Sequence, residues 1–121
     1  MIDNMKKTDE WLGYVISSPM ITNRKYFDVI HKLHKWRAKK GLKSRIIFNE
    51  KFRKFGEMRN VLPHTEVRYV AYDFPTVVNV AGNVTLLNVP SEEVTVFYIE
   101  NKQVADSFRE QFEQIWKEAK K

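Results

Sequence analysis

The chain has 121 residues, of which 43% are hydrophobic and 13% aromatic, so it fits one compact domain with a packed core and excludes wholesale disorder. No apolar run approaches the roughly 18 residues that cross a bilayer, and the start of the chain has no apolar signal core, so we expect a cytoplasmic protein without membrane contact. The absence of cysteine excludes disulfides, thiolate nucleophiles and Cys-ligated zinc.

The net charge of +6 is concentrated in one region of the chain. Between Arg24 and Arg59 there are 13 Lys and Arg residues against 3 acidic residues, which gives this region a charge of +10 and leaves −4 for the rest. Such a region attracts nucleic acid or phosphorylated ligands. The alternative, which the pattern alone favours, is a pair of solvated helix faces.

The first elements predict a parallel pair of strands. Residues 1–10 are polar and are expected to form a leader before a single domain over residues 11–121. Aromatic and β-branched residues over Gly13–Ser17 indicate a buried strand. Apolar residues at three-and-four spacing then predict a helix over Arg24–Lys40, and a second strand is expected over Arg45–Phe48. Strand, helix and strand in so short a stretch are typical of a βαβ unit.

Further strands follow a short second helix. Residues 50–59 have a helical pattern, and its inner side carries Phe52, Phe55 and Met58. Strands are expected over Val67–Val70 and Val94–Ile99. Between them, residues 76–89 alternate apolar and polar side chains around the turn at residues 81–83, which predicts a hairpin.

The chain closes with a helix over Lys102–Lys117, because Val104, Phe108, Phe112 and Ile115 make one apolar stripe. Asn101 is expected to cap this helix. The order of elements is therefore βαβα, several strands and a terminal helix. It predicts a mixed α/β domain with a largely buried sheet.

Chemistry-bearing motifs are scarce. His31, His34 and His64 are the candidates for metal binding or proton transfer near neutral pH, but no third ligand stands near the first two, so we expect no metal site and no cofactor. The serines lie in no nucleophile elbow, and the glycines form no phosphate loop. Trp36 and Phe52 stand between basic residues, as in some nucleic-acid binders, although helical periodicity places both on core faces.

From Trp36 onward the sequence resembles phospholipase D-like domains. Four stretches carry the resemblance: the helix end and strand start over Trp36–Phe48, the strand over Thr65–Tyr69, the hairpin over Val80–Val84, and the ending over Val96–Trp116 with its Ile-Glu-Asn-x-x-x-Ala-Asp-Ser-Phe-Arg pattern. It covers roughly residues 13–118. The resemblance implies a phospholipase D-like half with a mixed sheet and a C-terminal helix.

Active members of that family carry a His, a Lys two residues later and an Asp five residues beyond the Lys, with the His as nucleophile. Aligning the hairpin turn places Phe74, Thr76 and Ala81 at those three positions. The resemblance therefore implies a catalytically inactive chain that is not an enzyme. Residual phosphodiesterase activity is the weakest alternative.

Phospholipase D-like domains that lack the catalytic residues and end in the Val96–Trp116 pattern resemble the C-terminal regulatory part of TrmB-like archaeal transcription regulators. That resemblance implies dimerisation and effector sensing, with a sugar-like small molecule as the candidate effector. A winged helix-turn-helix domain precedes this part in those regulators, whereas about ten residues precede the first expected strand here. We therefore expect an isolated regulatory domain or a stand-alone relative, which contacts DNA only through a separate winged-helix domain or partner.

Candidate site residues follow from the expected positions of the elements. Polar residues at or near strand ends are the candidate ligand contacts: Ser17, Asn49, Asn79 and Asn88. Their alternative role is to cap turns. If the basic region instead forms a nucleic-acid-binding module, the candidate contacts are Lys35, Arg37, Lys39 and Lys40.

Self-association is expected as well, because phospholipase D-like enzymes bring two such halves together and this chain contains one. Trp11, Tyr72 and Phe74 have no obvious second layer in so short a chain. An exposed apolar patch of that kind usually marks an interface. We therefore expect a two-fold homodimer.

Overall fold

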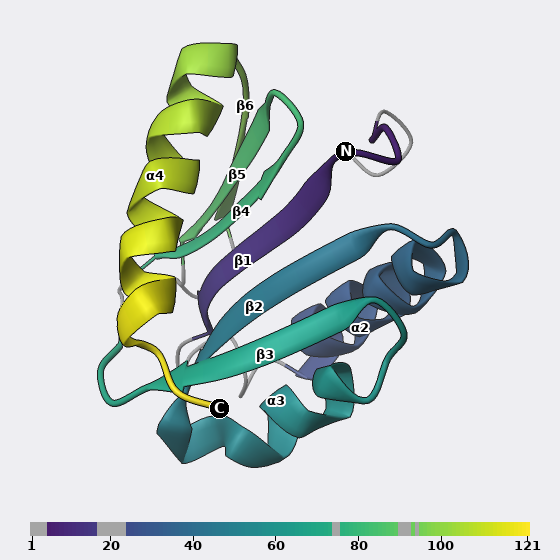
Figure 1. Ribbon diagram of the computed structural model, residues 1–121, viewed down its shortest axis with the longest axis vertical. Coiled ribbons are helices and arrows are strands. Elements are labelled where there is room, and N and C mark those ends of the chain that lie inside the picture. The colour runs from purple at the N-terminus through teal and green to yellow at the C-terminus, as the bar shows by residue number, and fades with distance from the viewer. Residues whose placement is uncertain (1–4, 17–23, 74–75, 90–92, 94) are drawn as a thin grey trace.

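The computed structural model describes residues 5–16, 24–73, 76–89, 93 and 95–121, and it has a six-stranded mixed sheet with helices on both faces (Figure 1). The strands stand in the order β3-β2-β1-β4-β5-β6. Their bounds are β1 Glu10–Ile16, β2 Lys43–Asn49, β3 Thr65–Val70, β4 Val77–Ala81, β5 Val84–Val89 and β6 Thr95–Glu100. The helices are α2 Arg24–Lys39, α3 Arg53–Asn60 and α4 Lys102–Glu118, and a 3-10 turn over Glu50–Phe52 precedes α3. This architecture confirms the mixed α/β class expected from the sequence.

The parallel half of the sheet contains β1, β2 and β3. Gly13 on β1 pairs with Ile46 on β2, which in turn pairs with Val67 on β3. Gly41 follows α2 with a φ of 78°, the left-handed conformation that closes a helix and that glycine adopts without strain. The βαβ unit predicted from the first 48 residues is present.

The other half is an antiparallel meander of β4, β5 and β6. Ala81 pairs with Val84 at the turn, where Gly82 has a φ of 57°. This is the hairpin predicted at residues 81–83. Because β4 also pairs with β1, β1 is the strand at which the sheet changes from parallel to antiparallel neighbours.

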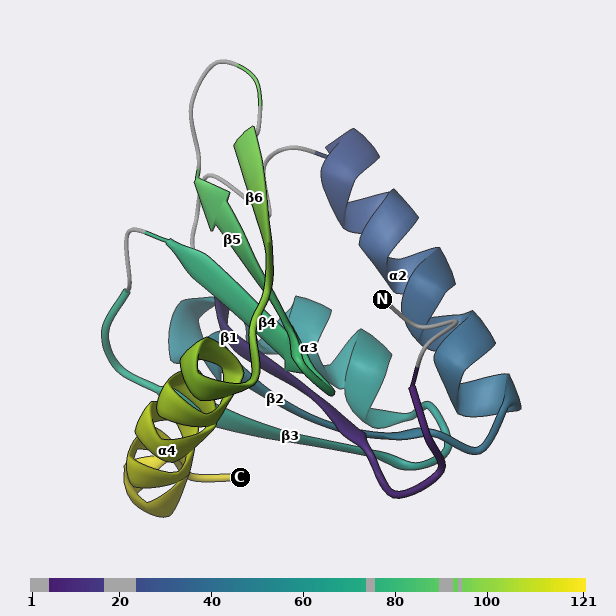
Figure 2. The same ribbon diagram turned by 90° about the horizontal axis from the view of Figure 1, so that it is seen from above.

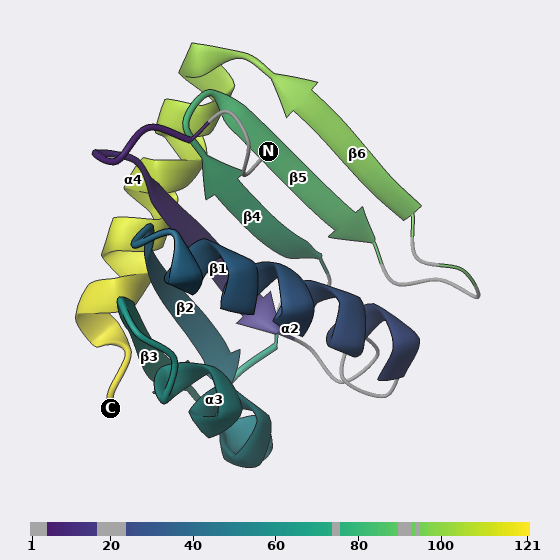
Figure 3. The ribbon, with the colours of Figure 1, turned by 90° about the vertical axis from the view of Figure 1, so that its right-hand side faces the viewer.

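The helices divide the core into two layers. Helix α4 covers one face of the sheet, and α2 and α3 cover the other (Figures 2 and 3). Leu12 and Ile47 pack with Phe112 on the α4 side, whereas Ile46 and Phe48 belong to the cluster on the opposite side.

The buried stripes of α2 and α3 differ from those predicted. Helix α2 buries Phe27, His34, Arg37 and Ala38. Trp36, expected in the core, is 41% exposed, and on α3 Met58 is 38% exposed while the neighbouring Arg59 is buried. The prediction was wrong because it counted only apolar residues, whereas both helices place charged or polar side chains on their inner faces.

Candidate functional site

Two of the three positions that the resemblance to phospholipase D-like enzymes aligns with catalytic residues lie in the described part of the chain. Thr76 lies half-buried just before β4, and Ala81 is buried at the end of that strand. Phe74 lies outside the described residues. Neither described side chain is an imidazole, an ammonium group or a carboxylate, so neither supplies the chemistry of the residue it would replace.

The three histidines occupy separate environments. His34 is fully buried, with its ring stacked on Trp11 at 3.9 Å between centroids, and His31 stacks on Phe27 at 5.9 Å. His64 is exposed in the turn before β3 with a φ of 58°. Within the part of the chain that the structure describes, no three His, Cys, Asp or Glu side chains come together as a metal site.

Two of the predicted asparagines have structural roles. Asn49 Oδ1 accepts a hydrogen bond from the Lys51 backbone N–H at 2.9 Å, and its Nδ2 donates to Asp73 Oδ1 at 2.7 Å. Asn88 Nδ2 donates to the Val77 carbonyl at 3.3 Å across the hairpin. Both side chains therefore hold strand ends and turns in place, as the alternative interpretation expected. Ser17 lies outside the described residues.

Arg37 is not available to nucleic acid, so that part of the prediction is wrong. Its buried guanidinium donates to the carbonyl oxygens of Leu42 at 2.8 Å and His64 at 3.2 Å, and to Thr65 Oγ1 at 2.7 Å. Arg37 thereby joins the end of α2 to the start of β3. Exposure of three other predicted contacts is confirmed: Lys35, Lys39 and Lys40.

A small chamber lies between α2, α3 and the sheet. Its walls are Tyr26, Phe27, Ile30, His34, Ile46, Arg59 and Asn79. We call this set of residues the α2 chamber. Arg59, with 1% of its surface exposed, lies with its guanidinium carbon 4.8 Å from the Phe27 ring centroid and 5.6 Å from that of Phe48. Burial lowers its pKa to about 10.

The chamber contains one predicted residue and one that the sequence analysis missed. Asn79 was among the candidate ligand contacts, and its Oδ1 accepts from Trp11 Nε1 at 2.8 Å. Arg59 was counted only as part of the basic region. The sequence feature that could have indicated its burial is its helical spacing from Phe52 and Phe55, since residues three and four apart share a helix face.

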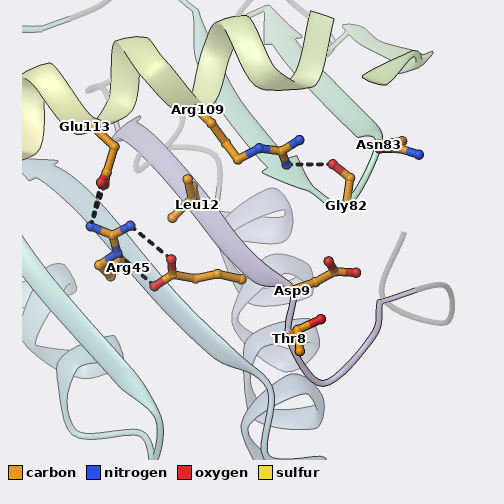
Figure 4. A pocket seen from close by; sticks show the side chains of 9 residues that line it. Thr8, Asp9, Leu12, Arg45, Gly82, Asn83, Arg109 and Glu113 are labelled. Atoms are coloured by element: carbon orange, nitrogen blue, oxygen red, sulfur yellow. Dashed lines mark hydrogen bonds and ion pairs between the residues drawn. The ribbon is translucent and has the colours of Figure 1, made fainter. Parts of the chain in front are cut away.

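A larger and more open cleft lies at the start of β1, beside the hairpin and α4 (Figure 4). It has a volume of about 410 Å³. Both of its arginines have partners: Arg45 contacts Glu10 at 2.8 Å and Glu113 at 2.6 Å, and Arg109 contacts Asp106 at 2.7 Å and donates to the Gly82 carbonyl at 2.6 Å. These contacts join β1, β2 and the hairpin turn to α4, so the two arginines of the cleft have structural roles.

Strand β6 forms one edge of the sheet and carries exposed apolar side chains. Val96, Phe97 and Tyr98 are 48%, 53% and 54% exposed. Trp11 does not belong to the exposed patch expected from the sequence, because it is buried and His34 of α2 stacks on its ring. Tyr72 is exposed, and Phe74 lies outside the described residues.

Comparisons with known proteins add the following. No family model matches the chain, and no curated protein matches it in sequence. In the described residues, no helix is long and apolar enough to span a membrane. Among solved structures, the chain is similar to TrmBL2, an archaeal chromatin protein whose structure shows a novel mode of DNA binding, with a TM-score of 0.70 and 16% identity. The likeness covers 99% of this chain and 47% of TrmBL2, so the chain has the fold of about half of that DNA-binding protein.

Proposed function

We propose that this chain is a non-catalytic dimerisation and effector-sensing domain of a TrmB-like transcription regulator, or a stand-alone relative of one. The fold shared with part of TrmBL2 supports the TrmB-like assignment. Thr76 and Ala81, where the phospholipase D-like resemblance expects catalytic groups, support a non-catalytic role. DNA would then be contacted through a separate winged-helix domain or partner.

The observation that carries the proposal is the exposed edge strand β6. Phe97 pairs with Leu87, which packs against the α4-side core, whereas the flanking Val96 and Tyr98 alternate to the opposite face of the sheet. Apolar side chains are therefore exposed on both faces of an edge strand. Soluble proteins usually protect such edges with charges, prolines or bulges, and none of these lies between Thr95 and Ile99.

A second copy of the same chain fits this edge. In a two-fold antiparallel pair centred on Tyr98, each Glu100 lies opposite Val96 of the other copy, so no like charges meet. The pair would satisfy the free backbone groups of β6 and cover its apolar side chains. We therefore assign β6 as the dimer contact, in place of the patch expected from the sequence.

Light scattering after size exclusion tests the assignment. The wild-type chain should have twice its 14.4 kDa mass at micromolar concentration, and Phe97→Lys should be a monomer because it places a charge in the contact. Tyr72→Lys is the matched control, since it changes an exposed aromatic residue away from β6. A wild-type monomer over a wide concentration range rejects the dimer.

A second candidate function, binding of nucleic acid by this domain itself, has one specific observation in its favour. The exposed side of α2 carries Lys32, Lys35 and Lys39, and the exposed Lys40 follows directly. If this surface binds DNA, affinity should fall steeply with salt, and Lys35→Gln/Lys39→Gln should lower the slope by about 2. Lys117→Gln on α4 is the control. If no DNA binding is detected at low salt, this function is rejected.

A further inference from the structure

The described part of the chain buries two full positive charges and no negative one. Its buried charged side chains are Arg37 and Arg59, and no Asp or Glu is buried with them. Charge removed from water is costly unless it is paired or hydrogen-bonded. Arg37 meets this requirement through the oxygen atoms of Leu42, His64 and Thr65.

Arg59 lacks such compensating hydrogen bonds. Among the described residues, no oxygen atom accepts a hydrogen bond from its guanidinium, and its Nε is buried without a partner. The contacts in its favour are the ring faces of Phe27 and Phe48. A ring face attracts a cation but accepts none of the directional hydrogen bonds that five N–H groups can donate. The guanidinium of Arg59 is therefore left with an unused donor, although the Tyr26 hydroxyl lines the same chamber.

The other polar groups of the α2 chamber can donate as well, and among them the Tyr26 hydroxyl can both donate and accept. Asn79 receives the Trp11 indole N–H on its Oδ1, which leaves its NH2 group to donate. His34 Nδ1 lies 3.3 Å from Arg37 Nη2, and since arginine only donates, Nδ1 is the acceptor and Nε2 carries the hydrogen. Arginine, amide and imidazole N–H groups around one cavity suit a negative ligand and repel a cation.

We propose that the α2 chamber binds a compact anion through Arg59. The enclosed space is about 10 Å³, which admits one water-sized group. It therefore fits a halide ion, or a single oxygen of a phosphate or carboxylate group. The inference refines the effector-sensing part of the proposed function and is independent of dimerisation, because β6 does not line the chamber.

Thermal unfolding of the full chain tests the site, with chloride and phosphate as the probes. Ionic strength is held constant with sodium gluconate, whose anion is too large for the chamber. A probe at about ten times its dissociation constant should raise the wild-type midpoint by roughly 5 °C, and the rise should saturate. A response to chloride alone identifies a halide site, and a response to phosphate alone identifies an oxyanion site.

Variants test whether the rise in the unfolding midpoint depends on Arg59 and the α2 chamber. Arg59→Met should abolish it, whereas Lys54→Met should keep it, because Lys54 is an exposed cation on the same helix. Asn79→Asp covers the case in which Arg59→Met does not fold: it places a carboxylate in the chamber as an internal anion, so the chain should fold and lose the response. Equal wild-type midpoints in chloride, phosphate and gluconate overturn the proposal, as does a response retained in Arg59→Met or Asn79→Asp. Mass measured on the same samples separates this outcome from failure of the dimer.

Discussion

At the scale of single residues, the inner face of α2 is built from polar side chains that the fold keeps from water. His34 stacks on Trp11 and accepts from Arg37. Burial holds the pKa of His34 well below its usual value, and the nearby positive charges of Arg59 and Arg37 lower it further. The ring is therefore neutral in the folded chain at neutral pH.

This neutral histidine predicts acid sensitivity. Below about pH 6.5, His34 binds a proton in the unfolded chain but not in the folded chain. The free energy of unfolding therefore decreases as pH falls, by up to about 1.4 kcal/mol per pH unit. His31, whose pKa is lowered mainly by burial, acts in the same direction. Urea unfolding between pH 7 and 5 measures the slope, and His34→Gln should reduce it. A wild-type stability that is constant over this range contradicts the prediction.

Hydropathy could not locate the candidate site at this scale. A sequence pattern assigns Arg37 and Arg59 to the surface, because charged residues are almost never fully buried. With Arg37 assigned to the surface, the predicted stripe of α2 was rotated toward Trp36. Asn79 was selected as a polar residue at or near a predicted strand end, but its neighbours in the chamber come from three separate elements.

At the scale of elements, α3 approaches β3 closely at Gly56. A Cβ atom at this position would lie 2.6 Å from Tyr69 Oη and 2.7 Å from its Cε1. Tyr69 is buried, and its hydroxyl donates to the Arg53 carbonyl at 3.3 Å and to the Glu57 carboxylate. The Tyr69 ring is thus fixed by hydrogen bonds to α3, the same helix against which it packs.

Gly56→Ala should therefore destabilise the chain, although alanine is the better helix former. Overpacking costs about 1–3 kcal/mol and exceeds the gain in helix propensity of about 1 kcal/mol at most, so we expect a net loss of about 1–2 kcal/mol. Chemical denaturation of the two proteins measures the difference. A neutral or stabilised variant would show that Tyr69 moves aside at no cost.

Most elements could be predicted because their apolar residues repeat with the period of a helix or strand. The observed α4, Lys102–Glu118, differs from the predicted Lys102–Lys117 by one residue. The role of β6 could not be predicted in this way. A strand that is apolar on both sides usually lies inside a sheet, and only the strand order shows that β6 stands at the edge.

At the scale of the whole molecule, the fold alone does not determine activity. We expect no hydrolysis of model diesters, phospholipid or DNA above the buffer rate, because Thr76 and Ala81 supply neither a nucleophilic imidazole nor its partners. Purified protein and a His34→Gln variant should give the same background. Turnover that co-purifies with the chain and disappears in a histidine variant would show that the alignment is wrong.

The position of α4 has a consequence for how the chain is made. Arg68 on β3 donates to the Trp116 carbonyl at 3.0 Å, and Tyr69 pairs with Lys120, so the end of α4 closes over strands synthesised much earlier. Until α4 leaves the ribosome, the face with Leu12 and Ile47 has no cover. Folding during translation is thus delayed until nearly all of these residues have emerged, and chaperones have their longest access to that face.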